Sequence, residues 1–374
     1  MTDFDARLRW TRAHMPVTRA IGEALPDLAG VRLACSMHLE IKMIPAIEAL
    51  SARGAAVLLT TCNPTTVCDE TIARCKAAGA EAHAWRGMSD AELEAGLRRI
   101  VDFRPTHLCE MGAAITTYLH ARPAEERASV RAAIEATGSG TTRLAALRPS
   151  YPVFNWDDLP IKEGLHNRHM VGLTACHAFF EGTRLTFHGK RVLVIGYGLV
   201  GRGVCDAARA YGGRVLVAEL DPARALEARF AGEEVVAWNE GLPLADVVVT
   251  ATGARNVIAE RELACMRDGA FLLNVGHASE EIDLAALRAH PSERVLPHVE
   301  RFSIGGRAIH LFAGGSMANL TAGHGDSLNA FDVTLAAMLA AIRFLVTEAP
   351  VAAPGVHLLP RHAWIDVARL AAQG

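Results

Sequence analysis

One glycine pattern between two short apolar runs constrains the fold of this chain more than any other feature. Residues 192–195 form a β-branched run, residues 196–201 read Gly-Tyr-Gly-Leu-Val-Gly, and the residues that follow are compatible with a helix. A second apolar run at 214–218 ends at Glu219. A lone GxGxxG pattern also occurs in βα turns of unrelated α/β domains, so it is weak evidence by itself. Strand, glycines, helix, second strand and terminal acid together favour a Rossmann dinucleotide site.

Each glycine in this pattern has a separate physical reason. The first makes the tight turn, the second lets a pyrophosphate approach the backbone, and the third lets the helix pack against the strand. The free N–H groups of the first helical turn then favour the negative charge of the pyrophosphate. The residues expected to contact it are Gly196, Gly198, Leu199, Val200 and Gly201. Glu219 is spaced to accept hydrogen bonds from both adenosine ribose hydroxyls, which favours NAD over NADP as the cofactor.

Composition excludes several other classes of protein. A chain of 374 residues that is 51% hydrophobic can bury a large core and is expected to hold two domains. The formal net charge of -3 argues against a nucleic-acid partner. Eight scattered cysteines without a CxxC pair predict a reduced, cytoplasmic setting and no metal site. Residues 1–5 are acidic rather than a signal peptide, and the apolar segment 333–346 is too short for a membrane span and contains Arg343.

Short apolar runs alternate with helical patterns along most of the chain, which predicts an α/β fold. Strands are expected at 31–34, 55–61, 106–109, 192–195, 214–218, 247–251, 270–274 and 309–313. Helices are expected at 44–53, 68–78, 90–101 and 164–180, with an irregular link at 152–160. The expected architecture is a doubly wound Rossmann NAD-binding domain, residues 166–327, inserted in a split α/β substrate domain. That substrate domain comprises residues 1–165 and the C-terminal helices of 328–374.

An ordered series of motifs extends over nearly the whole chain. It comprises Cys-Ser-Met-His at 35–38, Thr-Cys-Asn-Pro at 61–64, Lys162 with His166-Asn167, the glycine pattern, Glu-Leu-Asp-Pro at 219–222, Asn-Val-Gly-His at 274–277, Ser-Met-Ala-Asn-Leu at 316–320 and Gly-Val-His-Leu-Leu-Pro at 355–360. This series resembles the S-adenosyl-L-homocysteine hydrolase family. The resemblance implies tightly held NAD that oxidises the substrate ribose at C3′ and thereby acidifies the C4′ proton. A 5′ thiolate is then eliminated, water adds, and the ketone is reduced again, so NAD is recycled.

The resemblance also implies roles for individual residues. Lys162 matches the family lysine that takes the 3′-hydroxyl proton, although most lysines are simply surface residues. His38 and His277 match the two histidines that act around the 5′ position, although each could also be an ordinary core or loop histidine.

A second group of matched positions belongs to the cofactor side. Asn167 matches a residue near the nicotinamide, Asn274 and Asn319 match asparagines that face NAD, and Thr141 and Thr142 approximately match a threonine run that touches it. Ordinary loop capping is the alternative interpretation for all five, and it competes most strongly for the two threonines.

The positions that read the substrate depart from the family pattern. They are Glu40, Lys42, Met111, Ser139, His166, His324 and Asp326. The acid expected near the 5′ leaving group falls on Met111, with Glu110 beside it as a possible catalytic replacement. The ribose-binding aspartate falls on His166, the ribose-binding glutamate falls near Ser139, and the family's late histidine falls on Asp326.

The two adenine-reading positions are Glu40 and Lys42, and His324 stands where an apolar residue is usual. Because a buried polar site rejects ligands that leave its groups unpaired, these changes predict a different substrate.

Three functional hypotheses follow. The favoured one is the same C3′ oxidation and elimination on another nucleoside-like compound, expelling water or a different thiol. The second is an authentic S-adenosylhomocysteine hydrolase that tolerates the changes. The third is a catalytically silent NAD-binding regulator, which would not need Lys162, His38 and His277 together. The chain stops soon after residue 360 without the family tail, so we expect a homodimer or a homotetramer with more open NAD sites.

Overall fold

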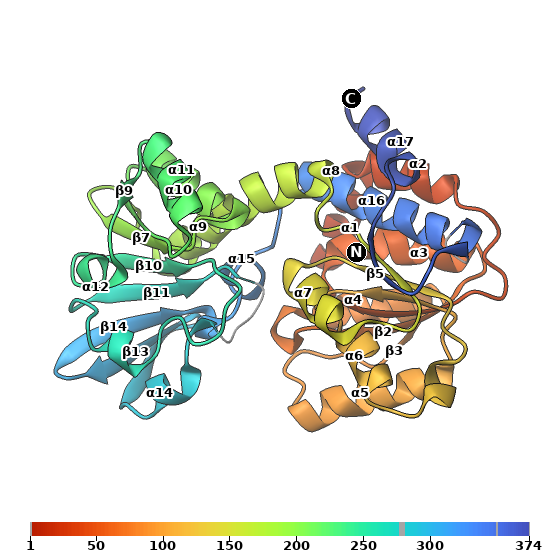
Figure 1. The fold of residues 1–374 in the computed structure, drawn as a ribbon, viewed down its shortest axis with the longest axis horizontal. Coiled ribbons are helices and arrows are strands. Elements are labelled where there is room, and N and C mark those ends of the chain that lie inside the picture. Colours follow the sequence, from red (N-terminus) through yellow and green to blue (C-terminus); the bar gives the residue numbers. More distant parts are fainter. Residues whose placement is uncertain (1, 277–280, 349–350, 374) are drawn as a thin grey trace. The chain divides into compact units, whose positions relative to one another are not determined.

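The computed structural model describes residues 2–276, 281–348 and 351–373, and the chain forms two compact units (Figure 1). Unit 1 comprises Met1–Lys162 and Leu328–Gly374, and unit 2 comprises Glu163–Ser327. Unit 2 therefore begins at Glu163 rather than at residue 166. Each unit contains its own sheet and its own hydrophobic clusters.

Unit 1 is built on a seven-stranded sheet with the order β3-β2-β1-β4-β5-β6-β15. The strands are β1 (Arg32–Met37), β2 (Ala56–Thr61), β3 (Glu81–Ala82), β4 (His107–Glu110), β5 (Ala132–Glu135), β6 (Pro152–Asn155) and β15 (Gly355–Leu358). All neighbouring pairs are parallel. The strand order reverses between β1 and β4, and ligands bind beyond the carboxyl ends of such strands at this switch point.

The helices of unit 1 follow local sequence signals. They are α1 (Asp3–Ala13), α2 (Pro16–Glu23), α3 (Ile44–Ala52), α4 (Asp69–Ala77), α5 (Asp90–Phe103), α6 (Ala114–His120), α7 (Gly138–Leu147), α8 (Pro160–Lys162), α16 (Leu328–Thr347) and α17 (Arg361–Ala371). Ser89 and Glu92 form a capping box at the start of α5, and Pro16 occupies the first turn of α2, where its missing N–H has no cost.

Helix α16 brings the C-terminal part of the chain into the core of unit 1. Fourteen of its residues are buried, and its side chains join the same cluster as those of β1 and α3. Its 20 residues are long and apolar enough to cross a membrane, so the expectation of a segment too short to do so was wrong. However, 78% of its most apolar window is buried inside the protein, as in a core helix.

Unit 2 contains an eight-stranded sheet with the order β12-β13-β14-β11-β10-β7-β8-β9. Its strands are β7 (Arg191–Ile195), β8 (Arg214–Ala218), β9 (Glu234–Val235), β10 (Val247–Thr250), β11 (Ala270–Asn274), β12 (Ser292–Leu296), β13 (Val299–Ile304) and β14 (Arg307–Phe312). Six neighbouring strands are parallel, in the order β9-β8-β7-β10-β11-β14. Strands β13 and β12 extend the sheet beyond β14 as an antiparallel edge. The parallel part has the strand order of a doubly wound dinucleotide-binding domain.

The helices of unit 2 complete this architecture. They are the π-helix η4 (Glu163–Met170), α9 (Val171–Thr183), α10 (Leu199–Ala210), α11 (Pro222–Phe230), α12 (Trp238–Gly241), α13 (Glu260–Leu263), α14 (Leu284–Arg288) and α15 (Ala318–Thr321). The contact between α10 and η4 requires small residues, because a Cβ at Gly203 would lie 2.3 Å from the carbonyl oxygen of Arg168.

The predicted fold class is confirmed, whereas two local expectations were wrong. The link at 152–160 contains strand β6, which lies between β5 and β15 and has all four residues buried. Its proline was misleading, because proline is tolerated as the first residue of a strand. The helix expected at 164–180 instead begins as a π-helix at Glu163, a form that periodicity does not reveal.

Candidate active site

The glycine loop of unit 2 has the geometry of a dinucleotide site. Gly196 has a φ of +97°, which favours glycine, and a Cβ at Gly201 would lie 2.0 Å from the carbonyl oxygen of Gly196. Helix α10 begins directly afterwards, and its N-cap residue Gly198 makes no side-chain capping bond. The first-turn N–H groups, including those of Leu199 and Val200, are thus not capped by that residue and can hold an anionic pyrophosphate.

Glu219 lies beside this loop, at the carboxyl end of β8. Its carboxylate accepts hydrogen bonds from the backbone N–H groups of Tyr197 at 2.6 Å, Leu220 at 2.7 Å and Asp221 at 2.9 Å. These bonds fix the acid against the glycine loop. A carboxylate has about four acceptor positions, so it retains capacity for a ribose hydroxyl of NAD.

The predicted cofactor-side asparagines occupy different environments. Asn274 is fully buried and links three segments, since it donates to the Gly315 carbonyl and accepts from Thr250 and Gly276. Asn319 lies on α15 and is 3% exposed. Its Oδ1 atom has no hydrogen-bond partner among the described residues. A buried amide oxygen without a donor is costly, and the carboxamide of a bound nicotinamide would supply one.

Asn167 lies on η4, the segment against which α10 packs. These features of unit 2 fit NAD: an uncapped helix N-terminus, a fixed acid after β8 and a buried acceptor on α15.

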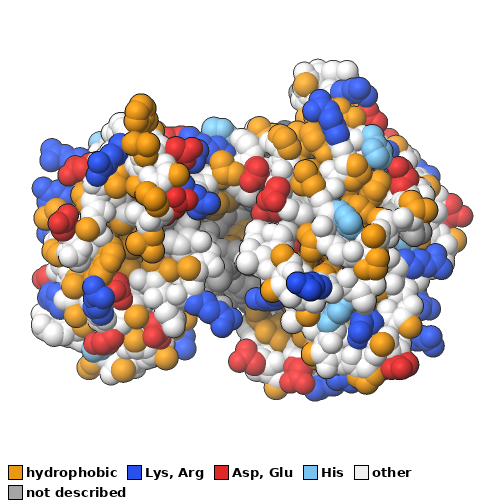
Figure 2. All heavy atoms as spheres, viewed as in Figure 1, with side chains coloured by type: hydrophobic (Ala, Val, Ile, Leu, Met, Phe, Trp, Pro, Cys, Tyr) orange, Lys and Arg blue, Asp and Glu red, His pale blue; other side chains and the backbone are white. Residues whose placement is uncertain are grey.

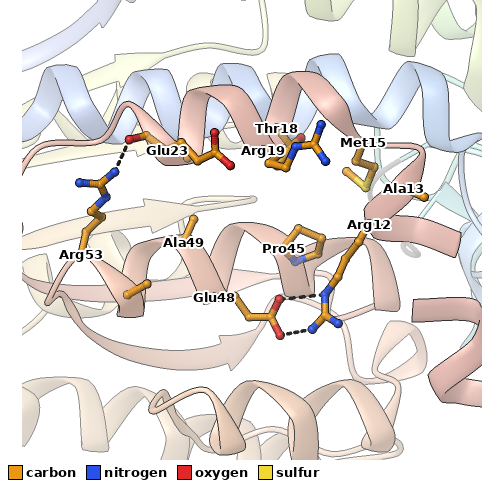
Figure 3. A pocket seen from close by; sticks show the side chains of 12 residues that line it. Arg12, Ala13, Met15, Thr18, Arg19, Glu23, Pro45, Glu48, Ala49 and Arg53 are labelled. Carbon is orange, nitrogen blue, oxygen red and sulfur yellow. Dashed lines mark hydrogen bonds and ion pairs between the residues drawn. The ribbon is translucent and has the colours of Figure 1, made fainter. Parts of the chain in front are cut away.

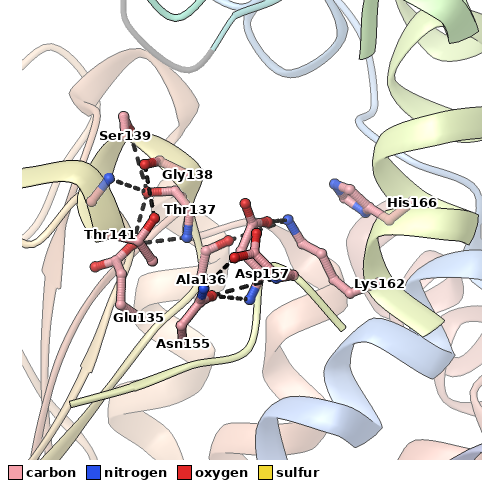
Figure 4. A network of polar contacts seen from close by, with 12 residues as sticks. Glu135, Ala136, Thr137, Gly138, Ser139, Thr141, Asn155, Asp157, Lys162 and His166 are labelled. Atoms are coloured by element: carbon pink, nitrogen blue, oxygen red, sulfur yellow. Dashed lines mark hydrogen bonds and ion pairs between the residues drawn. The ribbon is translucent and has the colours of Figure 1, made fainter. Parts of the chain in front are cut away.

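Lys162 is a buried residue of unit 1 whose side chain points toward Asp157 (Figure 4). It is 7% exposed, and its Nζ atom donates to the Ala136 carbonyl at 3.2 Å and contacts the Asp157 carboxylate. Asp157 is itself held by Asn155, whose Oδ1 accepts from its N–H at 2.8 Å. Lys162 is therefore not a surface lysine. Asp157 was not predicted from the sequence, because the strand β6 that precedes it was not predicted either.

Thr141 and Thr142, which were predicted to touch the cofactor, have different hydrogen-bond partners from Thr137, which follows the end of β5. The hydroxyls of Thr141 and Thr142 both donate to the Gly138 carbonyl within the first turn of α7, and both residues are outside the buried core. Thr137 caps α7 and also donates to Glu135 at the end of β5 (Figure 4). Ser139 contacts the Thr137 hydroxyl at 3.3 Å. The preference of threonine for helix N-caps could have identified Thr137.

Glu135 and Glu110 are two buried carboxyls on neighbouring strands, in register with each other. Glu110 accepts from the backbone N–H groups of Ile115 and Thr116 and from the Thr116 hydroxyl. Its carboxylate thus caps α6 and is 1% exposed. Burial raises the pKa of Glu110 to about 7, despite these donors. This environment favours a structural role for Glu110 over catalysis, and Met111 packs against the hydrophobic cluster.

His38 follows β1 and contacts residues that follow β2. Its Nδ1 atom lies 2.9 Å from the Thr66 hydroxyl and 3.5 Å from Cys62 Sγ. Burial raises the pKa of the Cys62 thiol, so this cysteine stays protonated. His277, the other histidine predicted to be catalytic, lies outside the described residues.

The two residues at the predicted base-reading positions form a pair in unit 1. Lys42 Nζ lies 2.9 Å from Glu40 Oε2 and 4.9 Å from the centre of the Phe331 ring. The Lys42 side chain is 3% exposed. A buried ammonium over an aromatic face is a cation–π arrangement.

Two predicted substrate residues of unit 2 contact each other. His166 Nδ1 lies 2.9 Å from Asp326 Oδ2, while His324 is exposed near them in the chain. His166 is also drawn in Figure 4.

Outside these residues, charged groups (Figure 2) and a cavity of unit 1 remain to be considered. Acidic and basic side chains are interspersed over the face shown in Figure 2, and no group of three or more metal-ligating side chains occurs among the described residues. A cavity of about 540 Å³ in unit 1 lies beside α2 and α3 and is lined by Arg12, Met15, Arg19, Glu48 and Arg53, among others (Figure 3). None of the predicted site residues lines it.

Comparison with known proteins places these features in one family. Residues 11–149 match the family model of S-adenosyl-L-homocysteine hydrolase, and residues 175–325 match that of its NAD binding domain. An S-inosyl-L-homocysteine hydrolase of Methanopyrus kandleri is 33% identical over 97% of this chain and 88% of its own length. Adenosylhomocysteinases of Aeropyrum pernix and Thermotoga maritima are 33% and 30% identical, over 97% and 99% of this chain and 90% and 94% of theirs. With a dinucleotide loop, a buried lysine and this full-length similarity, the chain belongs to the S-adenosyl-L-homocysteine hydrolase family and is an enzyme of the NAD-binding type.

Proposed function

We propose that this enzyme transiently oxidises C3′ of a nucleoside-like substrate and then eliminates a leaving group, water or a thiol, from the 5′ position. Bound NAD supplies the acceptor for the C3′ hydride and returns the hydride at the end of the cycle. The protein's own task is to move protons. It must remove one from the 3′-hydroxyl and one from C4′, and it must protonate the leaving group.

The buried pair of Lys162 and Asp157 carries this proposal. The Lys162 side chain is buried, and its contacts with the Ala136 carbonyl and the Asp157 carboxylate fix the position of Nζ. In the proposed step, Lys162 takes the hydroxyl proton as the hydride leaves C3′. Asp157 is a positioning residue in this scheme, because it acts through Lys162.

His38 is proposed to handle a proton at the 5′ position. Its Nδ1 atom contacts the Thr66 hydroxyl, and this contact fixes the orientation of the ring. His277 is proposed for the other proton, as the family resemblance implies. Glu110 is not part of the proposed proton path, because its carboxylate caps α6.

The base-reading positions support a substrate that differs from S-adenosylhomocysteine. An acid or amide reads the adenine amino group in the family pattern, whereas this chain places the Lys42 ammonium and Glu40 there. An ammonium only donates hydrogen bonds, so it favours a carbonyl over an amino group on the heterocycle. Relatives named S-inosyl-L-homocysteine hydrolase agree with this preference. Authentic S-adenosylhomocysteine hydrolysis is the second candidate, favoured by the relatives named adenosylhomocysteinase.

The test uses the purified protein with NAD and four probes: adenosine, inosine, S-adenosylhomocysteine and S-inosylhomocysteine. NADH absorbance reports C3′ oxidation, and deuterium taken up at C4′ from D₂O reports acidification of that proton. We expect both signals with at least one probe and neither signal with Lys162→Ala. Lys76→Ala, at an exposed lysine of α4, is the matched control. Unchanged signals in Lys162→Ala would exclude the redox mechanism, and no signal from any probe would favour the silent regulator.

A further inference from the structure

The loop after β10 forms one wall of the crevice in which a dinucleotide binds. The strand order of unit 2 reverses between β7 and β10, and ligands of doubly wound sheets bind beyond the carboxyl ends of the strands at such a point. The glycine loop follows β7, and residues 251–253 follow β10. The two loops touch, because a Cβ at Gly196 would lie 2.8 Å from the Ala251 carbonyl oxygen and 3.0 Å from Thr252 Cγ2. The path of the loop after β10 therefore determines where the glycine loop can lie.

The side chain of Glu281 holds the loop after β10 through three hydrogen bonds. Its Oε2 atom accepts from the N–H of Thr252 at 3.0 Å and from the Thr252 hydroxyl at 2.9 Å. Its Oε1 atom accepts from the N–H of Gly253 at 2.7 Å. Because Glu281 is fully buried, these hydrogen bonds lie in a region of low dielectric, where they are stronger than at the surface.

Glu281 is itself fixed to its surroundings and is therefore a firm support for the loop. Its carbonyl accepts from the N–H of Ile258 at 3.0 Å. Its carboxyl group packs against Gly276, which follows β11, since a Cβ at Gly276 would lie 1.6 Å from Oε1. The N–H of Gly276 donates in turn to Asn274 Oδ1 at 2.8 Å. Glu281 thus joins the loops that follow the neighbouring strands β10 and β11.

An acid at this position is a costly way to stabilise a fold as such. Burying a carboxyl group costs free energy unless its oxygens are hydrogen-bonded, and apolar packing would hold two loops together without that cost. Hydrogen bonds, however, also fix direction and distance, and a binding site requires its groups to be held within about 0.5 Å. On the side of β8, Glu219 holds the glycine loop in the same way. The glycine loop thus lies between two segments that carboxyl groups hold in place.

We propose that Glu281 is a positioning residue for NAD, which holds the loop after β10 against the glycine loop and thereby raises the affinity of the site for the cofactor. Its oxygens are directed at the loop, so Glu281 acts through Thr252 and Gly253 rather than by touching the cofactor. The proposal concerns the cofactor alone, and it does not depend on which substrate the enzyme accepts.

Calorimetric titration of NAD into the cofactor-free protein tests this role without substrate or turnover. In Glu281→Gln, the new NH₂ group faces a donor of the loop, and NAD should bind about tenfold more weakly, as expected for one lost hydrogen bond. Glu240→Gln is the matched control, because Glu240 is an exposed acid of α12 in the same unit. This control should bind NAD as the wild type does.

The thermal midpoint of unfolding of the cofactor-free protein separates positioning from stability. If Glu281 served the fold alone, Glu281→Gln would lower this midpoint and leave the affinity of the folded protein for NAD unchanged. Wild-type affinity in Glu281→Gln, whatever its midpoint, would therefore overturn the proposal.

A second pair of variants changes the partner of Glu281. Thr252→Ser keeps the hydroxyl donor and should retain the affinity for NAD, whereas Thr252→Val removes the donor and should weaken binding about threefold. Combining Thr252→Val with Glu281→Gln should weaken binding by less than the product of the two single effects, because both changes remove the same contact. If Glu281→Gln does not fold, equal affinities in Thr252→Ser and Thr252→Val would overturn the proposal. Such a failure leaves the proposed function untouched, because that function is tested by Lys162→Ala.

Discussion

The buried carboxyl of Glu135, at the end of β5, allows a quantitative prediction of how the stability of the protein depends on pH. Its carboxylate accepts from the N–H groups of Gly112 and Ala113 at 2.8 Å each, and from the N–H and hydroxyl of Thr137. Burial, with the neighbouring Glu110 as the second cause, raises the pKa of Glu135 from 4.5 to about 8. The folded protein therefore keeps a proton that the unfolded chain has already released.

The sign of the pH dependence follows from this raised pKa. Between pH 4.5 and about 8 the folded state binds more protons than the unfolded state, so the free energy of unfolding falls as pH rises. One pKa unit corresponds to about 1.4 kcal/mol, so the largest possible loss over this interval is about 5 kcal/mol. Glu110 and Glu135 interact, and the observed slope belongs to the pair.

Glu135→Gln removes the titrating group and tests the magnitude. Its amide oxygen can still accept from one side, whereas its NH₂ group faces a backbone donor, which costs about 1–3 kcal/mol. The variant should be less stable than wild type at pH 5 and should match or exceed it above pH 8.

Urea unfolding at several pH values measures this crossing. Four of the five tryptophans (Trp10, Trp85, Trp156 and Trp364) lie in unit 1, so Trp238→Phe makes fluorescence specific to that unit. If the free energies of unfolding of the wild type and of Glu135→Gln differed by the same amount at every pH, the reasoning would be refuted.

Four further predictions concern the cofactor, the chemistry and the assembly. Glu219→Ala should weaken NAD binding and reduce the preference for NAD over NADP, because the 2′-phosphate of NADP no longer meets a carboxylate. Calorimetry with both cofactors measures the two affinities, and equal affinities in the wild type would contradict the role of the acid. Gly201→Ala should abolish NAD retention on gel filtration, since its Cβ would lie 2.0 Å from the Gly196 carbonyl oxygen, and retained NAD would argue against the loop geometry. His38→Ala should still allow substrate-dependent NADH formation but stall before elimination, so mass spectrometry should find no product; normal product formation would remove His38 from the chemistry. The chain should sediment as a dimer or tetramer in analytical ultracentrifugation, and a monomer would contradict that expectation.

The regular parts of the fold were predictable because each has a local signal. The strand at Arg191–Ile195 and the glycine loop after it have a pattern set by short-range sterics, and both occur in the structure. Strand β6 was missed because its position is decided by its neighbours β5 and β15. Its four residues have no alternation of apolar and polar character, as expected for a strand buried on both faces.

Residues of the candidate site were predictable from the sequence only where a single residue occupies a recognisable motif position. Lys162 and His38 were identified from motif position, but their partners Asp157 and Thr66 were not, because these contacts depend on the paths of β6 and of the turn after β2. The pairing of His166 with Asp326 bridges 160 positions of sequence and has no local pattern. Long-range polar contacts of this kind are specified by the completed fold.

The passage of α16 through the core of unit 1 has a consequence for how the protein is made. Unit 2 is contiguous in the sequence and can complete its sheet as soon as residue 327 has left the ribosome. Unit 1 cannot complete its core at that point, because this core includes buried side chains from Leu328–Thr347. The first 162 residues must therefore wait, with apolar surface uncovered, while the NAD-binding unit is synthesised and folds. Order of synthesis thus makes the inserted unit the first to mature, and the unit that begins the chain the last.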